Sequence, residues 1–291
     1  MAEHVLEVNG LSVEFHTVYG RVHAVNDVSF HLDRGETLAI LGESGSGKSV
    51  SASAIMNLID SPPGYITAGE IRYKGESLIG MDGERRRRIN GQHIAMIFQD
   101  PLAHLNPVYP VGWQIAEILT AHGIAGADAR ARTLELAERV GIPDAKARMS
   151  HYPHQFSGGQ RQRLMIAMAL GLKPDILIAD EPTTALDVTV QAQILRLLEE
   201  LQEETGMGLL LITHDLGVVA EVADRVVVMN AGEIVEGGSV RDVFKKPKHA
   251  YTRKLIDAAP GRGGFLRNSC ASPAGPEPLL RVERFSNETL D

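Results

Sequence analysis

The sequence predicts an α/β fold in which a largely parallel sheet is covered by helices on both faces. Two observations carry this prediction. Residues 36–41, 176–180 and 209–213 form short, mostly apolar runs, as strands buried on both faces do. Segments with helical spacing separate these runs. Strands that alternate with helices favour a parallel sheet between two helical layers.

The remaining segments follow this plan in chain order. Residues 5–41 resemble a series of short strands, and a helix is expected from Lys48 until the Pro62-Pro63-Gly64 break. Residues 66–98 look rich in strands. The block 102–172 has helical spacing and no convincing strand, so we expect an inserted helical subdomain there. Further expectations are a helix over 189–204, a hairpin over 224–238, and a linker-like tail rich in Gly, Pro and Ser over 260–278.

Composition excludes several classes of protein. The 291 residues carry a net charge of −8, and this absence of a basic excess argues against a protein that wraps nucleic acid. Cys270 is the only cysteine, so the chain cannot form an internal disulfide, which fits a reducing cytosol. No apolar run approaches the roughly 20 residues of a membrane span, and the N-terminus does not resemble a signal peptide. We therefore expect any membrane role to act through a partner.

A glycine-rich loop is the strongest motif. Residues 42–49 read GESGSGKS between a predicted strand and a predicted helix, and they match the phosphate-binding pattern G-x-x-x-x-G-K-[ST]. Glycines let the backbone approach an anion closely, and the N–H groups that open the helix attract phosphate. Lys48 would reach the β- and γ-phosphates, and Ser49 would bind Mg²⁺. The residues expected to contact nucleotide are Gly42, Glu43, Ser44, Gly45, Ser46, Gly47, Lys48, Ser49 and Val50.

Two carboxylates end the apolar run at 176–180. Asp180 lies at the end of a predicted strand, where it can hold Mg²⁺ directly or through water. Glu181 follows at the mouth of the sheet and could orient and deprotonate an attacking water. Acidic strand ends are common by themselves. The phosphate loop in the same chain makes the catalytic interpretation the stronger one.

A second helix start also looks suited to phosphate. In FSGGQRQR, residues 156–163, Ser157 is a good N-cap and Gly158-Gly159 expose backbone N–H groups. A fold with its own phosphate loop needs no second such helix for the same nucleotide. We therefore expect Ser157, Gly158, Gly159 and Gln160 to serve the ATP of another subunit in a two-fold dimer.

Taken together, these motifs resemble the nucleotide-binding domain of ATP-binding cassette (ABC) proteins over residues 5–260, with Phe156 where the family signature usually has Leu. The resemblance implies a P-loop NTPase core with a mixed sheet, an antiparallel β subdomain and the inserted helical subdomain. It also implies roles for four further positions. Gln99 would touch Mg²⁺ and the attacking water, His214 the γ-phosphate and Tyr19 the adenine. The segment 184–187 would cross the dimer interface.

The resemblance also implies the function. The chain would be an ATPase, with catalysis by Glu181, His214 and Lys48, Mg²⁺ on Ser49, Gln99 and Asp180, and ATP as the bound nucleotide. The expected partners are two membrane permeases, a second ABC ATPase subunit in a homo- or heterodimer, an extracytoplasmic substrate-binding protein, and no nucleic acid. The location would be the cytoplasmic face of the bacterial inner membrane. The alternative is a non-transport ABC ATPase of the DNA-repair or translation type.

Three segments resemble a particular branch of the family. Residues 95–117, 178–195 and 249–256 are similar to import cassettes for oligopeptides and dipeptides, a branch that also serves glutathione and nickel. The expected organisation is a nucleotide-binding domain at 1–245 and a C-terminal extension at 246–291. Residues 280–286 partly repeat residues 6–12, either as the start of a second cassette or by chance.

Two other clusters have less specific interpretations. The run Arg85–Arg88 is expected to be a solvated face with acidic neighbours at Asp82 and Glu84. His151 and His154 are separated by Pro153 and have no further ligand nearby, so we expect no metal beyond Mg²⁺. Cys270 alone cannot hold the iron–sulfur cluster found in some relatives of this branch.

Overall fold

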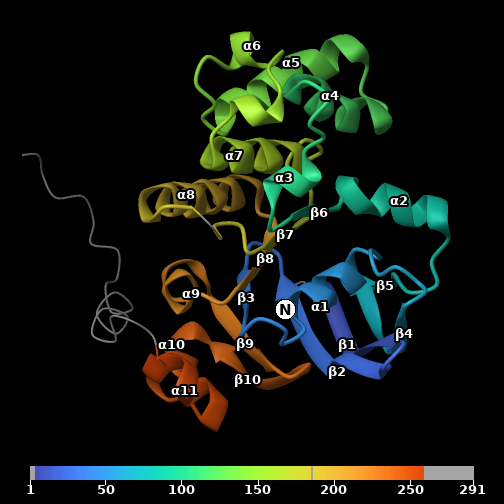
Figure 1. Ribbon diagram of the computed structural model, residues 1–291, viewed down its shortest axis with the longest axis vertical. Helices are drawn as coiled ribbons and strands as arrows, with labels where there is room; N and C mark the ends of the chain where they lie inside the picture. Colours follow the sequence, from blue (N-terminus) through green and yellow to red (C-terminus); the bar gives the residue numbers. More distant parts are fainter. Residues whose placement is uncertain (1–3, 185, 259–291) are drawn as a thin grey trace, which may run out of the picture.

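Two sheets form the framework of the chain (Figure 1). The structure, a computed structural model, describes residues 4–184 and 186–258. The larger sheet has six strands in the order β10-β9-β3-β8-β7-β6, all parallel except β10, which pairs antiparallel with β9. Its strands are β3 (Thr37–Leu41), β6 (Ile94–Ile97), β7 (Ile176–Asp180), β8 (Gly208–Thr213), β9 (Arg225–Asn230) and β10 (Glu233–Ser239).

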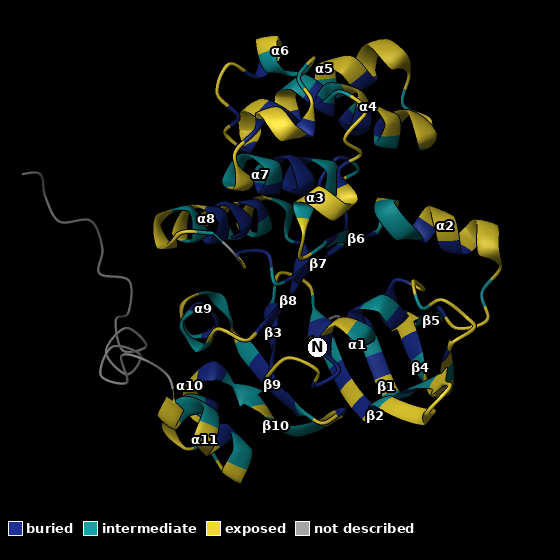
Figure 2. Cartoon of the chain, in the orientation of Figure 1, coloured by how far each residue is buried: buried dark blue, intermediate teal, exposed yellow. Residues whose placement is uncertain are grey.

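Strands β3, β7 and β8 are buried along their whole length, as their apolar sequences predict (Figure 2). Their side chains alternate between two cores because successive residues of a strand face opposite sides. In β7, Leu177 and Ala179 pack with the helical subdomain, while Ile176 and Ile178 pack toward the second sheet. The predicted α/β core with a mixed sheet is therefore confirmed.

The second sheet is antiparallel, with the order β2-β1-β4-β5. Its strands are β1 (His4–Thr17), β2 (Gly20–Asp33), β4 (Gly64–Tyr73) and β5 (Glu76–Ser77). The sequence predicts short strands over residues 5–41, but β1 and β2 are 14 residues each. Shifts of register divide their pairing, which is why their sequences resemble several shorter strands.

The predicted inserted block contains helices joined by turns and loops, and no strand. It contains α3 (Pro101–His104), α4 (Val111–Ala121), α5 (Gly126–Arg139), α6 (Ala145–Arg148), a 3-10 turn (Pro153–Gln155) and α7 (Gly158–Ala169). Helix α7 contacts α3, α4 and α5 as well as strand β6. It therefore joins the helical subdomain to the larger sheet, on the side away from the antiparallel sheet (Figure 1).

The arginine run departs from expectation. Residues 83–92 form helix α2 (Gly83–Gln92) within the segment expected to be rich in strands. Arg86 is buried and donates a hydrogen bond to the carbonyl of Ile55, and burial lowers its pKa to about 10. A fully solvated face is therefore the wrong interpretation for Arg86. Arg85 pairs with Glu76 at 2.7 Å, and Asp82 caps the helix.

The remaining helices flank the larger sheet. They are α1 (Lys48–Ile55), α8 (Val188–Thr205), α9 (Leu216–Val222), α10 (Val240–Lys245) and α11 (Ala250–Ala258). No helix among the described residues is long and apolar enough to cross a membrane. Cys270 and the partial repeat at 280–286 lie outside the described residues, and the division of the chain at residue 245 stays a prediction.

Candidate functional site

The phosphate loop lies between β3 and α1, as predicted. Two of its glycines have no room for a side chain. A Cβ on Gly42 would lie 2.4 Å from the carbonyl oxygen of Met229, and one on Gly47 would lie 2.5 Å from that of Ala24. Gly47 also has a φ of 103°, which side chains rarely adopt. The sheet and the β2 strand therefore hold the loop from both sides.

Lys48 folds back over this loop. It is only 4% exposed, and its Nζ donates to the carbonyl oxygens of Gly42 at 2.8 Å and Glu43 at 2.9 Å. Burial lowers the pKa of the Lys48 ammonium, although the carboxylates of Glu181 and Asp180 oppose this shift. The ammonium thus lies within a loop whose backbone suits an anion.

A hydroxyl and a carboxylate meet beside Lys48. The Oγ of Ser49 donates to Oδ1 of Asp180 at 3.0 Å. Burial raises the pKa of Asp180, because the charged carboxylate has lost much of its water. A cation on Asp180 would relieve that cost. These are hard oxygen ligands of the kind Mg²⁺ prefers, so the pair fits the ion that the sequence predicts.

An orphaned hydroxyl marks the same loop. Ser46 Oγ is buried and has no hydrogen-bond partner within the described part of the chain. Buried polar atoms are almost always hydrogen-bonded, so this hydroxyl is suited to a ligand. A phosphate oxygen in the loop would provide the missing acceptor.

Glu181 is held by side chains from three elements. It accepts hydrogen bonds from Gln99 Nε2 at 2.9 Å and Thr184 Oγ1 at 2.9 Å, and His214 Nδ1 lies 3.1 Å from Oε1. Gln99 follows β6 and His214 follows β8, and these strands flank β7, which ends at Asp180. The carboxyl ends of neighbouring parallel strands therefore bring the three side chains together.

The environment of Glu181 keeps its carboxylate charged. Burial alone would raise its pKa, but hydrogen bonds from Thr184 and His214, with the charges of His214 and Lys48, lower it below the ordinary value. The φ of Glu181 is 46°, a strained value for a residue with a side chain. This carboxylate is thus deprotonated, restrained, and beside the Asp180–Ser49 pair.

The Ser157–Gln160 segment opens helix α7, as predicted. The Oγ of Ser157 accepts from the backbone N–H of Gln160, and the side chain of Gln160 accepts in return from the N–H of Ser157. Ser157 is exposed. Helix α7 lies across the sheet from α1 in Figure 1, so the chain does not bring this segment to its own phosphate loop.

Tyr19 lies at the turn between β1 and β2 and is 98% exposed. Strand β2, which follows Tyr19, passes beside the phosphate loop at Ala24, whose carbonyl faces Gly47. The adenine-stacking role of Tyr19 stays a prediction. One contact has no counterpart in the sequence predictions: the hydroxyl of Tyr251 in α11 accepts from the backbone N–H of Glu43 at 3.2 Å. Tyr251 belongs to the motif HAYTR at 249–253. Because Tyr251 is 208 residues from Glu43 in the chain, the sequence alone gives no sign of the contact.

Comparison with known proteins agrees with this geometry. The profile of the ABC transporter family matches residues 25–184. The chain belongs to the ABC transporter family. It is 54% identical over 257 residues to the oligopeptide transport ATP-binding protein OppD of Bacillus subtilis, covering 88% of this chain and 72% of that protein. It is 51% identical over 280 residues to the dipeptide transport ATP-binding protein DppD of Lactococcus lactis, and the match covers 96% of this chain and 80% of that protein.

Another relative is longer. The glutathione import ATP-binding protein GsiA of Salmonella typhimurium is 51% identical over 296 residues, which cover 98% of this chain and 48% of that protein. Among solved structures, the ATP-binding cassette MJ0796, a dimer bound to ADP and phosphate, gives a TM-score of 0.72 at 28% identity, covering 81% of this chain and 99% of that one. The structure of CbiO1 from Clostridium perfringens gives a TM-score of 0.71 at 27% sequence identity, and the match covers 91% of this chain and 99% of that one.

The predicted ABC cassette fold is therefore confirmed. The predicted activity, ATP hydrolysis coupled to transport, is confirmed as well. These relatives are named as transport or import proteins and give no support to a DNA-repair or translation ATPase.

Proposed function

We propose that this ABC ATPase powers the import of dipeptides, oligopeptides or a related small solute at the cytoplasmic face of a bacterial membrane. The observation that carries the catalytic part is Glu181, a charged carboxylate restrained by Gln99, Thr184 and His214. The names of the relatives OppD and DppD support the class of cargo.

Each residue of the site has a separate role in the proposed ATP hydrolysis. ATP is held by the loop from Gly42 to Val50 and stacks its base on Tyr19. Ser49 and Asp180, with Gln99, would hold Mg²⁺, which when bound neutralises phosphate charge. Glu181 accepts a proton from the attacking water. Lys48 and His214 stabilise the charge that develops on the γ-phosphate.

A second cassette completes each site. Ser157, Gly158, Gly159 and Gln160 open α7 on the opposite subdomain, where they suit the phosphates of another chain. The dimeric state of MJ0796 supports this arrangement. The partner is a second ABC ATPase subunit, and we expect no nucleic-acid partner.

Permeases would contact the ATPase beside Gln99. A cavity of about 330 Å³ lies there, lined mainly by apolar side chains that include Phe98, Ile118, Met165 and Met168. Phe98 directly precedes Gln99, so a permease helix seated in this cavity could move the glutamine that holds Glu181. Two permeases and an extracytoplasmic substrate-binding protein complete the proposed importer.

The change Glu181→Gln tests the catalytic proposal. It keeps the size of the side chain and removes its basicity, so phosphate release should fall by about 100-fold or more, while ATP binding persists and the dimer accumulates. Phosphate release and size-exclusion chromatography with ATP would measure both. Glu203→Gln, at an exposed position of α8, serves as the control. Normal hydrolysis by the Glu181→Gln variant would show that Glu181 is not the base.

A further inference from the structure

Helix α11, the last helix in the described part of the chain, reaches the phosphate loop through one side chain. The hydroxyl of Tyr251 accepts from the backbone N–H of Glu43 at 3.2 Å. Glu43 is the second residue of the loop, and its carbonyl oxygen accepts from Lys48 Nζ at 2.9 Å. The same residue therefore connects α11 on one side and the loop lysine on the other.

The start of α11 is itself fixed. The side chain of Glu236 in β10 accepts from the backbone N–H groups of Lys248 at 2.7 Å and His249 at 3.0 Å. His249 Nδ1 then accepts from the N–H of Tyr251 at 3.2 Å. Thr252 is fully buried. The beginning of α11 thus has a defined position on the sheet rather than lying loosely on its surface.

The ring of Tyr251 is also anchored. It packs against a small apolar cluster that contains Leu41, Val226 and Val228. Leu41 is the last residue of β3 and precedes Gly42. The ring of Tyr251 therefore packs on a cluster that includes the end of β3, and its hydroxyl contacts the loop that follows this strand.

We propose that Tyr251 is a positioning residue for the ATP site, through which α11 orders the phosphate loop before nucleotide binds. The inference rests on the proposed ATP site. Because the Tyr251 hydroxyl restrains Glu43, it also restrains the carbonyl that holds Lys48. Loss of the hydroxyl leaves the loop less ordered, and ATP binding must then supply that order.

The change Tyr251→Phe tests this proposal, because it keeps the packed ring and removes only the hydroxyl. One net hydrogen bond corresponds to an increase of about threefold to tenfold in the KM for ATP. The kcat and the thermal midpoint should stay near those of the parent. Lys254→Ala, at an exposed position of the same helix, should change none of these values.

Other outcomes are decisive. An unchanged KM in Tyr251→Phe, or a lower thermal midpoint with an unchanged KM, would overturn the positioning role. Lys48→Ala separates this proposal from the one on which it rests. If Lys48→Ala also leaves ATP affinity unchanged, the proposed ATP site itself is wrong.

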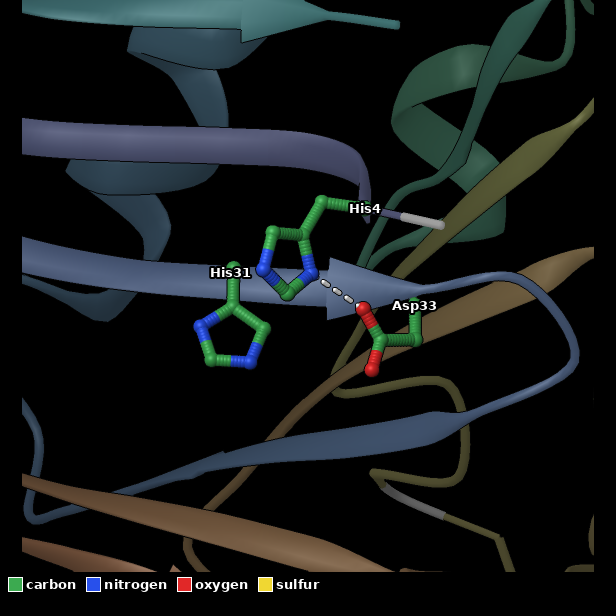
Figure 3. Close-up of side chains that lie close together, drawn as sticks. All are labelled: His4, His31 and Asp33. Carbon is green, nitrogen blue, oxygen red and sulfur yellow. Dashed lines mark hydrogen bonds and ion pairs between the residues drawn. The ribbon is translucent and has the colours of Figure 1, made fainter. Parts of the chain in front are cut away.

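A second and independent observation lies at the opposite end of β3. His4, His31 and Asp33 gather at the end of the β1–β2 pair (Figure 3), and their ligating atoms all lie within 4.8 Å of one another. His4 is the register partner of Asp33. His31 is two residues before Asp33, so both project from the same face of β2.

The chemistry of this group suits a transition metal. Two imidazoles and a carboxylate are a ligand set that Zn²⁺ accepts, with one position left for water. Arg225 is bound to Glu36 at 2.8 Å, which offsets its repulsion of a cation.

The geometry points to a divalent transition-metal site here, separate from the Mg²⁺ pair at Ser49 and Asp180. Strand β3, which spans about 13 Å at roughly 3.3 Å per residue, lies between the two positions. An ion at this site would tie the start of β1 to the end of β2.

Calorimetric titration of the full chain with Zn²⁺, in excess Mg²⁺ and without nucleotide, tests the site. One Zn²⁺ should bind, and His31→Gln should weaken binding by at least about tenfold. His16→Gln is the matched control, since His16 lies on the same hairpin at 3.6 Å from Glu14. No Zn²⁺ binding, or equal binding by parent and His31→Gln, would overturn the site, as would loss of binding in His16→Gln.

Discussion

At the scale of single residues, the pKa of the proposed catalytic carboxylate, Glu181, depends on the groups around it. Glu181 is partly buried, and burial alone would raise its pKa. The hydrogen bonds from Thr184 and His214, together with the charges of His214 and Lys48, lower that pKa below its ordinary value. A base for hydrolysis must be deprotonated, so this environment suits the role proposed for Glu181.

The change Thr184→Val tests this balance. It removes a donor that lowers the pKa of Glu181, so that pKa should rise and Glu181 should become protonated at a higher pH. The acid limb of kcat should therefore shift toward neutral pH, while kcat at the alkaline end changes little. A pH–rate profile from about pH 4.5 to 8 would measure the shift. Thr184→Ser keeps the hydroxyl and should restore the parent profile; a shift in this variant too would contradict the explanation.

At the scale of elements, side-chain caps fix where the helices around the site begin. Ser157 caps α7, Asp187 caps α8 and Asp215 caps α9, each by accepting backbone N–H groups of the first turn. Ser239 caps α10 in the same way, away from the predicted interface. Of these, only the helix opened by Ser157 is proposed to bind the ATP of a partner.

The pair of changes Ser157→Ala and Ser239→Ala separates capping from catalysis. Each should lower the free energy of unfolding by about 1 kcal/mol, because each removes one helix cap. ATP hydrolysis should fall in Ser157→Ala alone. Denaturant unfolding and phosphate release measure the two effects. Equal hydrolysis by both variants would limit Ser157 to a structural role.

At the scale of the whole molecule, the two segments proposed to bind phosphate lie on different subdomains. The loop is part of the core between β3 and α1, whereas Ser157 opens α7 on the helical side (Figure 1). The sheet packs against the helical subdomain on one face and against the antiparallel sheet on the other, and this packing holds the two features on different sides of the core. Two chains arranged head to tail would bring them together.

Mixing two impaired variants tests that arrangement. Lys48→Ala lacks the loop lysine and Ser157→Ala lacks the helix start, yet a mixed dimer contains one site with both groups. An equal mixture should recover up to about a quarter of the parent's hydrolysis, because half of the dimers are mixed and each has one complete site. Phosphate release before and after mixing measures the gain. A mixture no more active than the mean of its parts would assign the partner cassette to a different chain.

The sequence determined the motifs, because their chemistry is local. The glycines of the loop are required by backbone geometry, the apolar runs of β3, β7 and β8 by burial, and Ser157 by helix capping. The positions of the proposed ATP site and of the helical segment along the chain follow from these local features alone. Only folding decided the contacts between distant segments. Strand pairing brought Gln99 and His214 to Glu181 and joined His4 to Asp33. The packing of helices buried Arg86 and placed Tyr251 beside Glu43. Contacts between residues far apart in the chain leave no local sequence pattern from which they could be predicted.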